Sequence, residues 1–113
     1  FGGATCNAGL PCGALLGAVL AAGLYAGRRE PEDIHAKLRA ERLRAWLYAA
    51  FSRRFGALDC RTLLSADITC PEGMAAARSS GALLHCREYV AYAAELTERM
   101  LSGEAEESEP QPL

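Results

Sequence analysis

The sequence predicts an all-α protein, a small helical bundle of about four helices. Half of its 113 residues are hydrophobic, alanine is abundant, and aromatic residues make up only 7%. Extended runs of β-branched residues, which favour strands, are absent. A chain of this length suits one domain that removes roughly two-thirds of its surface from water. We therefore expect a single helical domain over residues 1–102 and an acidic tail over 103–113.

The first helix is predicted from about Pro11 to Tyr25. The segment before it is rich in glycine and turn residues, as loops are. Proline suits a first helical turn, where its missing N–H group is not needed, and Gly27 is a typical helix stop. No charged residue occurs from Leu10 to Gly27. The stretch is nevertheless interrupted by glycines and is slightly short of a ~30 Å hydrocarbon core, so it is not expected to span a membrane.

The second helix is predicted from Pro31 to about Phe55. Proline at its start and acidic residues in its first turn favour a helix N-terminus. Gly56 is the expected stop. Apolar residues recur at helical spacing and should form the buried stripe, namely Ala36, Ala40, Leu43, Leu47 and Ala50, widened by Trp46 and Phe51.

Three further helical segments follow. One or two turns should begin at Asp59 as the N-cap residue, and a short helix should follow Pro71 and end near Gly81. The last helix is the clearest and should end at Gly103. Its shared face comprises Cys86, Tyr89, Val90, Ala93, Leu96, Thr97 and Met100.

Charge is unevenly distributed along the chain. The formal net charge is −2, and residues 28–54 hold eight Lys/Arg against four Asp/Glu. This balance lacks the markedly basic face of a nucleic-acid-binding protein. An arginine face is either solvated or docks an acidic partner (Arg39, Arg42, Arg44, Arg53 and Arg54). The acidic, proline-containing tail predicts disorder, and the lack of a basic region before the apolar run argues against a signal peptide. We expect a soluble, cytoplasmic protein.

Cysteines are the main chemical feature of the chain. There are five, an odd number that cannot pair completely within one chain: Cys6, Cys12, Cys60, Cys70 and Cys86. Long helices are unlike a disulfide-rich scaffold, so metal, cluster or redox use competes with a role as small buried side chains. Cys12 lies at a predicted helix N-terminus, where free N–H groups stabilise a thiolate.

Small residues recur every four positions in the first predicted helix. One series is Gly13, Gly17 and Ala21, and the other is Ala14, Ala18 and Ala22. Such faces let another backbone approach closely. Close packing alone explains them, or Gly13 additionally leaves room for a group bound at Cys12.

Four segments together resemble a known family. "FGG" precedes "CGALLG" at Cys12–Gly17, "FGALDCRTLL" surrounds Cys60, and "DITCPEG" precedes "HCREYVAYAAELTERML", which contains Cys86. In this order they resemble the redox-active family named C-GCAxxG-C-C after its cysteine pattern, which contains a CGAxxG motif. The resemblance covers nearly all of residues 1–102.

The resemblance implies a small all-helical bacterial or archaeal domain with four characteristic redox-active cysteines. It is similar to a domain of split-Soret cytochromes, in which an iron–sulfur centre accompanies haem. Cys12, Cys60 and Cys86 correspond to three of the four family cysteines. The first family cysteine belongs to a helix upstream of "FGG", so by this resemblance the chain is N-terminally truncated. Cys6 is a candidate replacement ligand, and Cys70, which lies outside the family pattern, is left without an assigned role. No CxxCH sequence occurs, so covalent haem is not expected.

Three functions therefore compete. The first is a redox protein in which Cys12, Cys60 and Cys86 converge at one end of the bundle. They would ligate an iron–sulfur cluster for electron transfer or perform thiol–disulfide exchange with a redox partner. The second is a structural zinc site, disfavoured by the lack of CxxC pairs and by the ordinary surroundings of His35 and His85.

The third candidate function is a non-catalytic helical interaction module, and a homodimer is compatible with all three. Hydrolase motifs and phosphate-binding loops are absent from the sequence. The sequence does not decide whether the protein is an enzyme.

Overall fold

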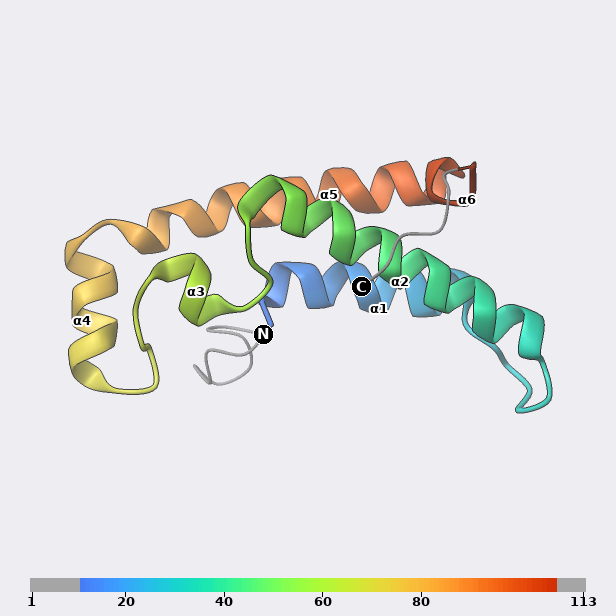
Figure 1. Cartoon of the computed structure of the whole chain (residues 1–113), viewed down its shortest axis with the longest axis horizontal. Helices are drawn as coiled ribbons and strands as arrows, with labels where there is room; N and C mark the ends of the chain where they lie inside the picture. The colour runs from blue at the N-terminus through green and yellow to red at the C-terminus, as the bar shows by residue number, and fades with distance from the viewer. Residues whose placement is uncertain (1–10, 108–113) are drawn as a thin grey trace.

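The computed structural model describes residues 11–107 and is all-α, as the sequence predicts (Figure 1). A 3-10 turn, η1 (Ala82–His85), leads into α5. The described part holds no strand, only an isolated antiparallel bridge between Pro11 and Asp59. The helices are α1 (Gly13–Ala26), α2 (Ile34–Phe55), α3 (Cys60–Leu64), α4 (Pro71–Ser79), α5 (Cys86–Leu101) and α6 (Glu104–Glu107).

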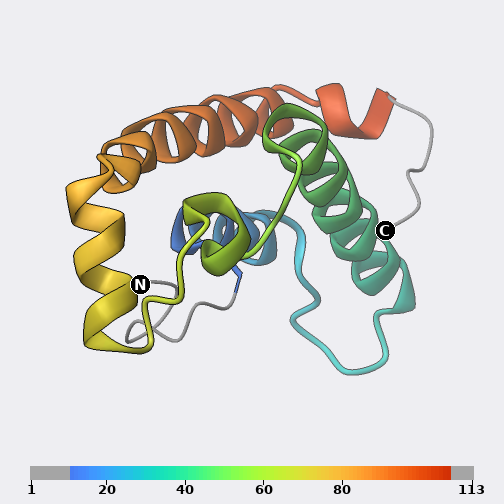
Figure 2. The same cartoon turned by 60° about the vertical axis from the view of Figure 1, so that its left-hand side comes forward.

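Three long helices form the body of the described chain. Helices α1 and α5 lie side by side and run in the same direction, whereas α2 returns in the opposite direction and packs against both (Figure 1). The short helix α4 crosses the end at which α5 begins, with α3 beside it (Figure 2). Helix α6 lies at the opposite end of α5. The three-helix body therefore has a distinct end formed by α3 and α4.

Helix α1 begins two residues later than the proline suggested. Cys12 is its N-cap residue, and Pro11 is held in an extended strand-like pairing with Asp59. The helix ends at Ala26, one residue past the prediction. The backbone N–H of Gly27 donates to the carbonyl of Gly23 at 2.8 Å, and a Cβ atom at Gly27 would lie 2.4 Å from that oxygen. This close contact between the backbones of Gly23 and Gly27 explains why glycine occupies the position after the helix end.

Helix α2 begins at Ile34 and not at the predicted Pro31. The side chain of Asp33 accepts a hydrogen bond from the N–H of Ala36 at 3.0 Å, so Asp33 is the N-cap residue and the proline lies in the preceding turn. The predicted end is confirmed at Gly56, which has a left-handed φ of 80°.

The main core lies between α1, α2 and α5. The predicted stripe of α2 is buried at Leu43, Leu47 and Ala50, and Trp46 and Phe51 are buried beside it. Helix α1 contributes Leu15, Ala18, Ala22 and Ala26, and α5 contributes Tyr89, Ala93, Leu96 and Met100. A second, smaller core joins α3 and α4 through Cys60, Leu64, Ile68 and Ala77.

Residues 104–107, expected to begin a disordered tail, form α6 instead. Arg99 donates two hydrogen bonds to Glu104, at 2.7 and 2.9 Å, and Ala105 is buried against the main core. These contacts compensate for the weak helix propensity of so short a segment. Residues 108–113 lie outside the described residues, and none of the described helices is long and apolar enough to cross a membrane.

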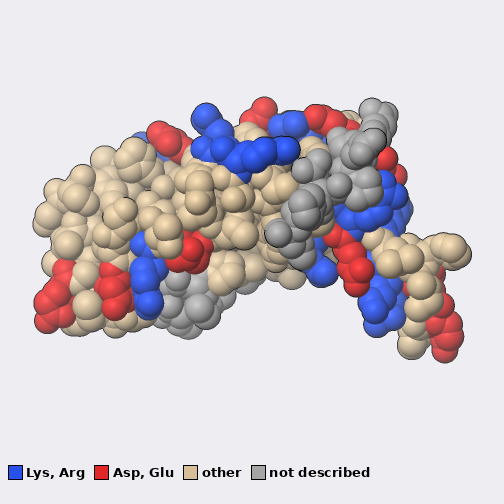
Figure 3. All heavy atoms as spheres, viewed as in Figure 1, with Lys and Arg blue, Asp and Glu red and all other residues tan. Residues whose placement is uncertain are grey.

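Basic side chains lie over both ends of α2 (Figure 3). Part of the predicted arginine face is used within the molecule. Arg39 pairs with Glu106 at 2.6 Å, and Arg54 lies over the rings of Phe55 and Tyr92, 5.5 and 5.6 Å from their centroids. Arg39 and Arg54 therefore make contacts within the molecule.

Candidate functional site

Cys12 is held beside the start of α3 by a short antiparallel contact. Its N–H group donates to the carbonyl of Leu58 at 2.7 Å, and Pro11 opposes Asp59. Cys60 directly follows Asp59 and begins α3, so this contact places Cys12 beside the N-terminus of α3. The contact brings together two cysteines that are 48 residues apart in the sequence.

Cys60 is the first residue of α3 and is buried in the smaller core. Asp59 caps the helix as predicted, because its carboxylate accepts hydrogen bonds from the N–H and the hydroxyl of Thr62 at 3.0 and 2.8 Å. These bonds lower the pKa of Asp59. A fixed negative charge therefore lies next to the Cys60 thiol.

Cys86 joins the two cores. It is the first residue of α5, directly after η1, and it packs against both the main core and the smaller core. Its partly buried side chain is the most accessible of the three, since Cys12 and Cys60 are only 6% and 8% exposed.

The three thiols lie close enough together for negative charge on one to raise the pKa of another. Burial raises the pKa of Cys60, and negative charge on Cys12 and Cys86 raises it further. Burial and then negative charge on Cys12 raise the pKa of Cys86. All three thiols are free. The structure thus brings Cys12, Cys60 and Cys86 into one neighbourhood at the α3 end of the body.

Tyr89 borders this thiol cluster and was not singled out from the sequence as a site residue. Its hydroxyl donates to the carbonyl of Leu63 at 3.3 Å, and its ring contacts that of Phe55 at a centroid distance of 4.7 Å. Burial raises the pKa of Tyr89, as does negative charge on each of the three cysteines, with Cys86 first. Its position three residues after Cys86, on the same helix face, was the available signal.

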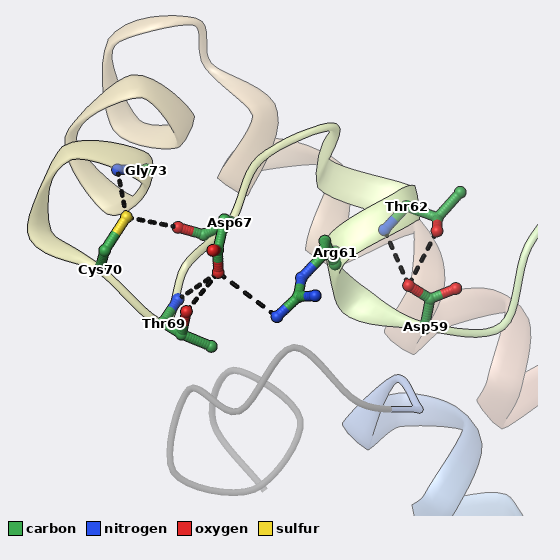
Figure 4. A network of polar contacts seen from close by, with 7 residues as sticks. All are labelled: Asp59, Arg61, Thr62, Asp67, Thr69, Cys70 and Gly73. Atoms are coloured by element: carbon green, nitrogen blue, oxygen red, sulfur yellow. Dashed lines mark hydrogen bonds and ion pairs between the residues drawn. The ribbon is translucent and has the colours of Figure 1, made fainter.

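Cys70 has different surroundings, at the start of α4 (Figure 4). Its sulfur accepts a hydrogen bond from the N–H of Gly73 and donates one to the carbonyl of Asp67, each at 3.4 Å. Asp67 in turn accepts hydrogen bonds from Thr69 and pairs with Arg61 at 3.5 Å. Cys70 therefore caps a helix, a role that the sequence did not indicate.

The described residues do not present a metal site as they stand. Within residues 11–107, no group of three or more His, Cys, Asp or Glu side chains has a geometry able to hold a metal ion. His35 is exposed on α2, and His85 is exposed beside Glu88 at 3.6 Å. Cys6, the candidate replacement ligand, lies outside the described residues.

The two series of small residues in α1 have different surroundings. Ala18 and Ala22 are buried in the helix contact, as expected. Gly17 is not in close contact, because a Cβ atom there would meet nothing within 4 Å in the described chain. A shallow groove of about 290 Å³ lies between α1 and α5, lined by Gly13, Ala14, Gly17, Ala18, Val90, Ala93, Ala94 and Thr97.

The fold and the site thus define a small all-helical protein with a cluster of three thiols from separate segments. The chain belongs to the family described as "Putative redox-active protein (C_GCAxxG_C_C)", whose model matches residues 1–100. No curated protein and no solved structure matches the chain.

Proposed function

We propose that the chain is a thiol–disulfide redox protein and that Cys12, Cys60 and Cys86 are its reactive residues. The observation that carries this proposal is the convergence of three free thiols from three separate segments. The N–H of Cys12 is hydrogen-bonded to Leu58 just before Cys60, and Cys86 packs against the core that contains Cys60. Membership of a redox-active family supports the same class of function.

Cys12 is the proposed nucleophile. It is the N-cap residue of α1, a helix of 14 residues whose first N–H groups favour negative charge nearby. Cys60 and Cys86 have raised pKa values and are held as protonated thiols at neutral pH, which suits groups that react second. A transient opening around Cys86, the most accessible thiol, would admit the substrate disulfide.

The proposed reaction is exchange with a disulfide of a partner protein or a small molecule. The Cys12 thiolate attacks one substrate sulfur, so a mixed disulfide forms and the other substrate sulfur leaves and takes up a proton. Cys60 or Cys86 then loses its proton and attacks the Cys12 sulfur. This step releases the second substrate thiol. The chain loses two electrons and two protons, and the substrate disulfide becomes two thiols.

Either second thiol is compatible with this sequence of steps. A disulfide requires Cα atoms about 4.4–6.8 Å apart, so the oxidised chain must bring its reacting pair within that distance. The pair is therefore to be identified by experiment.

The test is equilibration of the reduced full chain with dithiol–disulfide buffers, followed by alkylation and peptide mass spectrometry. We expect one internal disulfide between Cys12 and either Cys60 or Cys86, with Cys70 still available for alkylation. Cys70→Ser is the matched control and should oxidise as the unmodified chain does. Cys12→Ser should abolish the disulfide. No internal disulfide, or one that requires Cys70, would contradict the proposal.

Iron and acid-labile sulfide should be measured on protein purified without oxygen. Stoichiometric iron and sulfide would contradict thiol exchange and show that the cysteines bind an iron–sulfur cluster. Its missing ligand would then come from Cys6 or a second chain. Their absence after reconstitution, together with the expected disulfide, would support the thiol–disulfide mechanism.

A further inference from the structure

Helix α1 has an apolar face that nothing in the described chain covers. It contains no charged residue over Gly13–Ala26, and Leu20 and Leu24 are 55% and 87% exposed. A helix that is apolar on all sides is normally buried on all sides. This face is distinct from the thiol cluster, and its exposed leucines are suited to contact with another apolar surface.

The uncovered face follows a regular stripe. Its members on α1 are Gly13, Gly17, Leu20 and Leu24. Their spacings of four, three and four residues are those of a helix–helix seam. The first two residues of the stripe are glycines, and the last two are leucines with large side chains.

Helix α5 carries a second stripe with the same spacing. It consists of Val90, Ala94, Thr97 and Leu101. Val90 and Leu101 are 58% and 51% exposed. The hydroxyl of Thr97 donates to the carbonyl of Ala93 at 2.8 Å, so it does not require a partner outside the helix. Four of the eight large exposed hydrophobic side chains of the described chain lie on these two stripes.

The groove between the two helices shows how the stripes are aligned. Its walls are Gly13–Ala18 of α1 and Val90–Thr97 of α5, so these two segments lie at the same level. The midpoint of the α1 stripe falls between residues 18 and 19, and that of the α5 stripe falls between 95 and 96. Both midpoints therefore lie close to one line across the face.

We propose that this face, α1 with α5, binds a second copy of the chain in an antiparallel arrangement. A two-fold axis through the two midpoints places Leu24 opposite Gly13 of the second copy and Leu20 opposite Gly17 of the second copy. The same axis places Val90 opposite Leu101 of the second copy. On α1, each large side chain thus meets a small residue. The contacts are reciprocal between the two copies, as an isologous interface requires.

The size and charge of the face suit a homodimer. Fourteen residues of helix span about 21 Å, and two helices side by side are about 20 Å wide. Two such faces bury on the order of 1,000 Å², the lower limit for a specific interface. Neither stripe contains a charged residue, so contact between two copies brings no like charges together at its centre. A dimer with a micromolar dissociation constant is expected.

Sedimentation equilibrium of the reduced full chain tests the proposal, and reduction excludes dimers linked by a disulfide. Leu24→Glu should weaken dimerisation by about tenfold or more, since it places a charge against an apolar groove. Leu38→Glu is the matched control, because Leu38 is 51% exposed on α2 and lies off this face. It should leave the dimerisation constant within about twofold.

The antiparallel register has its own test. Gly17→Leu should weaken the dimer, because two leucines then oppose each other. The double variant Gly17→Leu, Leu20→Gly should restore it, since each introduced leucine then meets an introduced glycine. Circular dichroism verifies that each variant is folded. A chain that remains monomeric at submillimolar concentration would overturn the proposal. That result is also the one expected if another segment or another protein covers this face. A dimer insensitive to Leu24→Glu, or no rescue by the double variant, would overturn the proposal as well.

Discussion

Cys60 and Cys86 ionise less readily than a cysteine in water, because Cys60 is buried in the smaller core and Cys86 packs between the two cores. Burial is the main cause of each raised pKa, and negative charge on Cys12 acts in the same direction. At residue scale, the site therefore combines one thiol at a helix N-terminus with two thiols that favour the protonated state.

The raised pKa values predict a loss of stability at alkaline pH. The folded chain retains thiol protons that the unfolded chain, with an ordinary thiol pKa of 9.0, releases. The free energy of unfolding should therefore be unaffected below about pH 8 and fall as the pH rises past 9.0. The slope reaches at most about 1.4 kcal/mol per pH unit for each thiol. Urea unfolding between neutral pH and pH 10 measures it.

Cys60→Ser should reduce this slope, because it removes one of the two thiols. Leu64→Val is the control, since it shortens a buried side chain of the same small core and should lower stability about equally at every pH. An equally steep slope in Cys60→Ser would show that other groups cause the pH dependence.

At element scale, side chains at helix starts determine where the helices begin. Asp59 and Pro71 were predicted correctly at the starts of α3 and α4. Pro31 was predicted wrongly as the start of α2. The helix begins at Ile34, because the carboxylate of Asp33 caps it there. The cap of α4 was missed altogether, since it is the sulfur of Cys70, and capping is normally predicted from oxygen-containing side chains.

Gly73 should be intolerant of any side chain. A Cβ atom there would lie 1.7 Å from the carbonyl oxygen of Asp67, a backbone atom that cannot move without reshaping the loop before α4. Gly73→Ala should therefore destabilise the chain by about 1–3 kcal/mol. Gly23→Ala is the matched control within α1, where a Cβ atom meets nothing within 4 Å. It should stabilise the chain by up to about 1 kcal/mol.

Thermal unfolding of the two glycine variants gives the comparison. Equal melting temperatures for Gly73→Ala and the unmodified chain would mean that the loop before α4 adjusts freely. That result would contradict the close approach between Asp67 and Gly73.

At the scale of the whole molecule, two cores of unequal size meet at the thiol cluster. The main core holds α1, α2 and α5 together, and the smaller one holds only α3 and α4. Few buried side chains secure the smaller unit, so it should open locally before the body unfolds. Such opening would expose Cys60 and Cys86 to a substrate.

Ile68→Ala should increase this local opening. Ile68 is buried in the smaller core, and its truncation should cost about 2–5 kcal/mol of local stability. We expect faster alkylation of Cys60, with hydrogen exchange in α2 unchanged. Leu47→Ala, in the main core, should instead accelerate exchange throughout the chain. If Ile68→Ala accelerated exchange in α2 equally, the two cores would unfold as one unit.

The sequence by itself determined the all-α class, most helix ends and the identity of the candidate cysteines. These features depend on helix propensity, caps and apolar spacing, which act over a few neighbouring residues. Only the tertiary structure decided that Cys12, Cys60 and Cys86 meet beside Tyr89, that α6 forms, and that Val90 and Leu24 face outward. Contacts between distant segments depend on how whole helices pack, and local sequence patterns do not specify that packing.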